Sequence, residues 1–218
     1  MRIIKIIAKN KDNLRLLIEK EIHQYGYTCN LNHIDVSHIT NMSHLFFESE
    51  FDGDISKWNL SNVEDVSYMF CNSQFNGYIS QWNVSKVINM RCMFAKSQFN
   101  GDISQWNVSQ VTDMSHMFYK SLFNQDISEW SVYSIINMKH MFEKSEFNQE
   151  LSDWKPISII DKECMFDNSV LEKNNKLPYW ANIDPEFIQS AINSYELNKK
   201  LNQELNQQNH TKKPTMKV

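Results

Sequence analysis

Histidine and cysteine recur every 24 residues in this chain, in a column that could supply metal ligands. The column consists of His44, Tyr68, Cys92, His116, His140 and Cys164. A tetrahedral zinc site needs four ligands that converge on one ion at about 2.0–2.3 Å. Residues that recur in successive repeats form a line, so two of them can meet, whereas four cannot surround one ion. We therefore predict a solvated helical face here, without a bound metal.

A second column carries carboxylates at the same interval. Its members are Asp54, Tyr78, Asp102, Asp126 and Glu150. Paired carboxylates could hydrolyse a glycosidic bond, but a straight row on a ridge offers no enclosed pocket for a substrate. A polar row of Lys57, Gln81, Gln105, Glu129 and Asp153 lies beside it. We predict that the first column is a face that binds a protein partner; the alternative is an ordinary soluble surface.

No other pattern predicts catalysis or a cofactor. The four cysteines show no C-x-x-C pairing, and no arrangement of serine or cysteine with histidine suggests a nucleophile. The net charge of -4 gives no attraction to nucleic acid or to anionic lipid, and no segment has transmembrane length. We expect a non-enzymatic protein with no cofactor and no membrane span, whose partner is another protein. An enzyme of unknown class is the weaker alternative.

The columns are positioned by a repeat. Five tryptophans lie 24 residues apart, from Trp58 to Trp154, and Trp180 follows after 26. Counting back from each tryptophan gives six units that fill residues 35–180. A fixed period of this length is typical of a solenoid, in which stacked units share one core. We expect the tryptophans to pack in or near that core. The alternative is an exposed aromatic ladder that binds sugars or single-stranded nucleic acid.

Four apolar columns are expected to point inward. They run from Ile39 to Ile159, from Leu45–Phe46 to Met165–Phe166, from Phe51 to Leu171 and from Ile55 to Leu151. In each unit an Asn or Asp before the M-x-x-M-F run predicts an N-cap and a short helix. The alternating residues of "DISQWNV" predict a short strand, and Asn-Gly predicts a turn. Recurring serines (Ser49 to Ser169) and asparagines (Asn76 to Asn148) are expected to satisfy backbone groups.

The ends are predicted to cap the repeats. Residues 1–34 hold a strand and an amphipathic helix that begins after Asn10 and stops at Gly26. Residues 181–206 hold a helix with Asp184-Pro185 at its start, and we expect it to cap the last unit. A free helix for a partner is the alternative. Residues 207–218 are polar and are expected to be disordered.

The words "LNHIDVSHITNMSHLF" and "FNGDISQWNVSQVTDMSHMF" carry a family resemblance. Over about residues 1–206 the chain resembles the BspA-like leucine-rich repeat proteins, in the variant first noted as a repeat of mycoplasma-type lipoproteins. The resemblance implies an α/β, leucine-rich-repeat-like solenoid, often found on bacterial surfaces, where some members act as adhesins or bind host proteins. The first residues, "MRIIKIIAKNKDN", lack the form of a secretory signal. We therefore expect a cytoplasmic location; the resemblance implies the cell surface as the alternative.

Overall fold

A computed structural model describes residues 5–211, and the side chains up to residue 204. Its elements are β1 (Ile6–Ile7), α1 (Lys11–Tyr25), β2 (Ile34–Asp35), α2 (Val170–Lys173), the 3₁₀ turn η1 (Pro185–Phe187) and α3 (Ile188–Thr211). The chain divides into two compact units, one ending at Pro178 and the other beginning at Tyr179. Trp180, the last tryptophan of the repeat, therefore belongs to the second unit. No helix among the described residues has the length and apolar character needed to cross a membrane.

The first unit begins with a strand and a helix. β1 pairs in parallel with β2, and the amides of Ile6 and Ala8 donate to the carbonyls of His33 and Asp35. The Asn10 side chain accepts from the amide of Asn13 at the start of α1, and Gly26 ends the helix with a φ of 84°. These two helix boundaries confirm the sequence prediction. α1 buries Leu14 and Ile18, whereas Tyr25 at its end is exposed. Residues 1–4 of the predicted strand lie outside the described residues.

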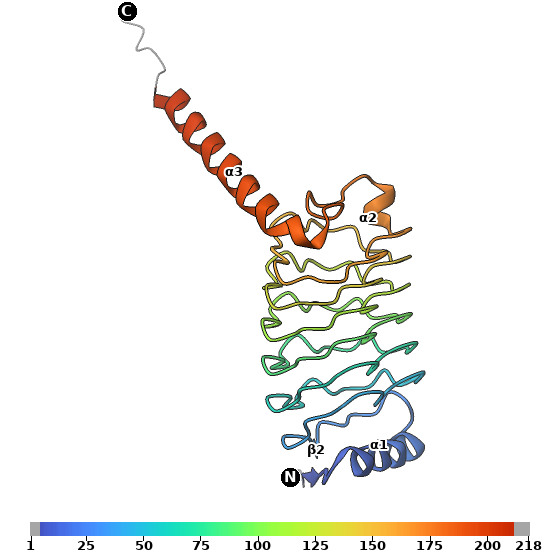
Figure 1. The fold of residues 1–218 in the computed structure, drawn as a ribbon. Coiled ribbons are helices and arrows are strands. Elements are labelled where there is room, and N and C mark those ends of the chain that lie inside the picture. The colour runs from blue at the N-terminus through green and yellow to red at the C-terminus, as the bar shows by residue number, and fades with distance from the viewer. Residues whose placement is uncertain (1–4, 212–218) are drawn as a thin grey trace, which may run out of the picture. The chain divides into compact units, whose positions relative to one another are not determined.

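Between β2 and α2 the chain winds into stacked coils, which Figure 1 shows in side view. Parallel bridges connect each coil to the next through residues 24 apart: Asn41, Asp65, Asn89, Asp113, Asn137 and Asp161. The short strand and short helix predicted for each coil are both wrong. Residues 42–48 and their equivalents form consecutive turns, and "DISQWNV" contains no strand. The asparagine or aspartate before the turns closes an Asx-turn instead of a helix N-cap; Asp113 Oδ1, for example, accepts from Ser115 N–H at 2.8 Å.

The turns divide their amide groups between two kinds of hydrogen bond. The amides of His44, Phe46 and Glu48 donate to the carbonyls of Ser67, Met69 and Cys71 in the next coil, at 2.9–3.0 Å. The amides between them donate within the coil, to the carbonyl three residues back. An α-helix would direct all of them to the carbonyl four residues back. The same division recurs in the following coils, so the backbone is satisfied without regular secondary structure.

Two residues in each turn run have positive φ. The first belongs to the column from His44 to Cys164 and the second to the column Glu48, Asn72, Lys96, Lys120, Lys144 and Asn168, all with φ of 52–58°. A positive φ at the third residue is what a type II turn requires. It also prevents a helix, because L-residues form helices only with negative φ. The predicted helical face is therefore a turn face.

The predicted core columns are all buried, which confirms them. Phe94 and Phe118 stack at 6.0 Å between ring centroids, and the inner phenylalanine of each coil also contacts the next along the chain, as Phe118 and Phe123 do at 4.2 Å. The prediction omitted two further buried columns. One runs from Val36 to Val132 and the other from Met42 to Met138. Buried apolar side chains from all sides of each coil therefore fill its interior.

The predicted Asn-Gly turns are absent. Gly53 and Gly77 do not have positive φ; among the glycines only Gly26 does. Glycine is needed at these positions because the neighbouring atoms leave no space for a Cβ. A Cβ on Gly77 would lie 2.8 Å from the Phe75 ring, and one on Gly53 would lie 2.0 Å from the Cys29 carbonyl oxygen.

The second unit contains η1 and α3. Pro185 opens η1 as predicted, but the Asp184 side chain makes no capping hydrogen bond. Ile188 and Ile192 are buried and Tyr179 stacks on Tyr195 at 4.1 Å, whereas Leu201 is exposed. α3 runs to Thr211, so the predicted disordered tail begins with helical residues. Residues 212–218 lie outside the described part of the chain.

We predict that Phe118→Ala lowers the free energy of unfolding by about 3–5 kcal/mol, because the ring is fully buried and its loss leaves a cavity. Chemical denaturation followed by circular dichroism measures the change. Unfolding like that of the unmodified chain would contradict the stacked phenylalanine core.

We predict that Lys96→Val lowers stability by about 1–2 kcal/mol, because a β-branched residue fits poorly at positive φ. Lys96→Gly is the matched control at the same exposed site, and we expect it to be at least as stable as the unmodified chain. Thermal unfolding compares the two. Equal melting temperatures for the valine and glycine variants would show that the φ of 55° is not retained in solution.

Candidate functional site

The predicted carboxylate column lies on the surface, with all five residues exposed. The carboxylates also contribute to the local fold. Asp102 Oδ1 accepts from Ser104 N–H and Asp126 Oδ1 from Ser128 N–H, both at 2.9 Å. Asp54 and Glu150 make the same bond to the serine two residues on. The column is therefore a row of turn-forming carboxylates as well as a charged ridge.

These hydrogen bonds set the acidity of the row. The Ser104 amide, and then its hydroxyl, stabilise the ionised carboxylate of Asp102 and lower its pKa. Ser128 lowers the pKa of Asp126 in the same way. Both side chains are thus held as anions, suited to attract a basic partner and unsuited to act as general acids near neutral pH.

Tyr78 is the exception in this row. Its ring cannot make the turn bond, and none of the described residues makes a hydrogen bond with Ser80 N–H. Tyr78 is 89% exposed, the highest value for any large apolar side chain in the described residues. It borders a hollow of about 380 Å³ whose lining includes Asn100, Asp102 and Gln125. A bare aromatic ring beside a shallow hollow and a carboxylate is typical of a protein-binding surface.

The histidine and cysteine column forms part of the turn face. His44 stacks on Tyr68 and His116 contacts His140, each pair with ring centroids 4.6 Å apart. Only neighbours in the stack meet, as expected of a line. Within the described residues no cluster of three histidine, cysteine or acidic side chains could hold a metal ion.

The tryptophan ladder is buried. The five tryptophans from Trp58 to Trp154 are no more than 4% exposed, and each indole N–H donates to a carbonyl 27 residues earlier; Trp106 donates to Ile79 O at 3.1 Å. The alternative of an exposed aromatic ladder for sugars or single-stranded nucleic acid is therefore wrong. The indoles instead join each coil to the preceding one.

The recurring serines and asparagines satisfy backbone groups, as predicted, except Ser73, whose buried hydroxyl has no hydrogen-bond partner among the described residues. Ser97 Oγ donates to Phe94 O, and Asn100 N–H donates to the side-chain oxygen of Asn76 in the preceding coil at 2.8 Å. The asparagines are exposed or half-buried, so they form a ladder along the surface. Two of these asparagines, Asn76 and Asn100, line the hollow beside Tyr78 together with the glycines that follow them.

A family model matches the chain in three overlapping segments, residues 20–122, 72–180 and 95–208. Its description is "Mycoplasma protein of unknown function, DUF285". The chain belongs to this family. Repeated, overlapping matches are those of a repeat protein, in agreement with the stacked coils. No curated protein matches the chain, and no solved structure matches it.

We predict that Asp126→Ala lowers the stability by about 0.5 kcal/mol, because an exposed turn hydrogen bond is lost. Asp126→Asn keeps an acceptor oxygen and is the matched control. The folded pKa lies below the unfolded one, so the extra stability of the carboxylate is present above the unfolded pKa, about 3.9. It disappears as the pH falls through the folded pKa. Denaturation at neutral and acidic pH measures this, and a difference between Asp and Asn that grows in acid would refute the assignment.

Proposed function

We propose that this chain is a non-enzymatic repeat protein that binds another protein through its carboxylate row, with Tyr78 as the central contact. We further propose that its coils are a leucine-rich-repeat-like solenoid of the BspA-like kind. The three overlapping family matches support the part of this proposal that makes the chain a repeat protein.

The observation that carries the proposal is the exposure of Tyr78. Elsewhere the column holds a residue that closes a turn, so tyrosine weakens the local hydrogen bonding and leaves an apolar ring in water. A residue that breaks a local rule without a structural gain is expected at a functional site. Tyrosine is also among the residues most enriched at the centres of protein interfaces.

The surroundings of Tyr78 favour a basic partner. Asp54 and Asp102 flank it one coil to either side, and Asp126 follows Asp102. Their lowered pKa values keep Asp102 and Asp126 charged at neutral pH. A partner with a lysine- or arginine-rich rim around an apolar pocket would match both the charges and the ring.

We predict that Tyr78→Asp abolishes partner capture without loss of stability. Aspartate is the residue found at this position in three other coils and can bond Ser80 N–H, so we expect equal or higher thermal stability. Affinity purification followed by mass spectrometry, with the unmodified chain as reference, identifies the partner. Surface plasmon resonance then measures its binding.

Tyr133→Ser is the matched control. Tyr133 is 45% exposed in a column where four other coils have serine, so this change also restores the repeat and removes an exposed tyrosine. Capture that survives Tyr78→Asp, or that is lost equally in both variants, would contradict a site centred on Tyr78.

A further inference from the structure

The first coil has a row of backbone carbonyls to which no described residue donates a hydrogen bond. In the second coil the carbonyls of Ser67, Met69 and Cys71 accept amides from the coil before. Their equivalents in the first coil are the carbonyls of Ser43, Leu45 and Phe47. None of the residues that the structure describes donates a hydrogen bond to these three oxygens. Alternate carbonyls along one edge are what an added strand pairs with.

α1 leaves this row open because it is a helix. Elsewhere on the first coil, extended chain stands in for a preceding coil: β1 pairs with β2, and the carbonyls of Tyr27 and Cys29 accept from Asp52 and Asp54. Beside the turn run lies α1, whose amides bond within the helix. Among the described residues, Lys11 alone links α1 to this part of the coil by hydrogen bonds, which its ammonium donates to the side-chain oxygens of Asn41 and Ser43.

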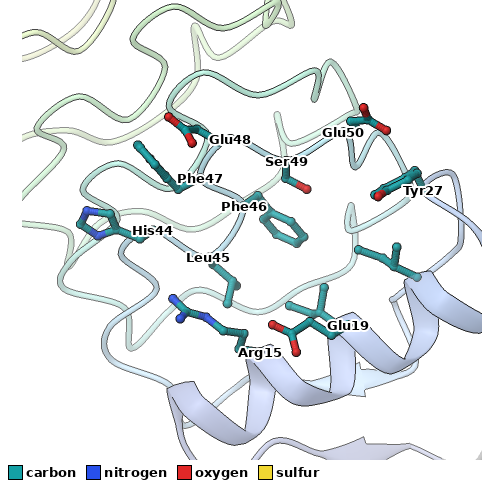
Figure 2. A pocket seen from close by; sticks show the side chains of 12 residues that line it. Arg15, Glu19, Tyr27, His44, Leu45, Phe46, Phe47, Glu48, Ser49 and Glu50 are labelled. Carbon is teal, nitrogen blue, oxygen red and sulfur yellow. The ribbon is translucent and has the colours of Figure 1, made fainter.

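A groove of about 730 Å³ lies between α1 and this run. Its lining includes Ile18 and Ile22 of α1 and residues 44–50 of the first coil. Figure 2 shows Leu45 and Phe46 between the helix and the coil, with Arg15 and Glu19 on the helix. Phe47 and Tyr27, also in the lining, are 40% and 48% exposed. The groove therefore offers apolar contacts next to the free carbonyls.

The groove is acidic. Glu19, Glu48 and Glu50 line it against the guanidinium of Arg15, while the Lys11 ammonium binds Ser43 beside the lining, and no ion pair involves these three glutamates within the described part of the chain. Burial is the largest cause that lowers the pKa of His44, so its ring is neutral at neutral pH. The charge thus favours a cationic occupant.

We propose that this groove binds an extended, basic–apolar peptide segment of a partner protein by backbone pairing. Alternate amides of the peptide donate to the carbonyls of Leu45 and Phe47, the two members of the row that line the groove. Apolar side chains at every second position lie against Ile22, Tyr27 and Phe47, the apolar lining residues that are half-buried or exposed, and lysine or arginine side chains meet Glu48 and Glu50. The groove is separate from the carboxylate row, so it adds a second site to the one proposed around Tyr78.

The test uses the full chain and a fluorescent peptide of about seven residues in which lysine and valine alternate. Fluorescence anisotropy measures the affinity. We expect binding by this peptide, and loss of binding when its alternate amides are N-methylated or when glutamate replaces its lysines. Hydrogen exchange of the bound peptide should show alternate amides protected.

Variants of the chain test whether the peptide binds in this groove. Glu48→Lys combined with Glu50→Lys should weaken binding about tenfold or more, since two favourable charges become unfavourable. Three other coils hold lysine at the position of Glu48 with the same positive φ, so the fold tolerates it there. Glu146→Lys, in the column of Glu50 but four coils away, is the matched control and should bind normally. Tyr78→Asp should also bind normally, which separates this site from the other one.

Three results would overturn the proposal. The first is equal binding of the N-methylated peptide, which would show that the backbone row is not used. The second is equal loss of affinity in Glu146→Lys, which would show only diffuse attraction to an acidic surface. The third is a dimer of the chain that Glu48→Lys dissociates while the peptide does not bind, because the occupant would then be a second copy.

Discussion

The structure depends on the way its turns divide their backbone amides. In each run, alternate amides donate to carbonyls within the same coil. The amides between them, such as those of His44 and Phe46, donate to carbonyls of the next coil. Positive φ at two positions per run makes this division possible, and the inward phenylalanines and tryptophans then stack in register. Left-handed residues other than glycine each cost about 1 kcal/mol or more. The shared hydrogen bonds and the continuous apolar core offset that cost, so a single isolated coil would not be stable.

A fold made this way has a direction, and its two ends differ. Within the turn runs each coil donates amides to the next one and accepts through its carbonyls from the one before, whereas elsewhere amides donate to the preceding chain, as that of Asp52 does to Tyr27. At the first coil, extended chain provides hydrogen-bond partners on two sides, through the amides of β1 and the carbonyls of Tyr27 and Cys29, and a helix lies beside the turn run on the third. The helix supplies apolar packing through Leu14 and Ile18 but no amides. The acidic groove beside Leu45 and Phe47 follows from this mismatch between a helix and a row of carbonyls.

The period, the buried columns and the helix boundaries at Asn10 and Gly26 could be predicted from the sequence, because apolar spacing and capping residues express them directly. The conformation inside the coil could not. M-x-x-M-F has helical spacing, and the positions with positive φ hold mostly lysine, cysteine, tyrosine and glutamate; only the histidines and the asparagines at 72 and 168 are of types enriched in the left-handed region, too few to reveal the pattern. The surface position of the carboxylate row could be predicted, but its bonds to serine amides could not. The groove at α1 also escaped prediction, since it depends on carbonyls that no side chain marks.

In a repeat protein the residues that break the pattern are more informative than those that keep it. Most columns here are constrained by the neighbouring coils: a carboxylate closes a turn, an asparagine side chain accepts an amide 24 residues later, and an indole bonds the preceding coil. A residue that keeps the pattern therefore shows only what the folding of the coils requires. Tyr78 gives up such a bond and exposes its ring, and the first coil ends in unpaired carbonyls beside carboxylates that form no ion pair within the described residues. Neither feature stabilises the stack, whereas each offers a partner contacts that the remaining coils lack. Binding is therefore expected where the repeat is interrupted, at one side chain in its middle and at one open edge beside its first helix.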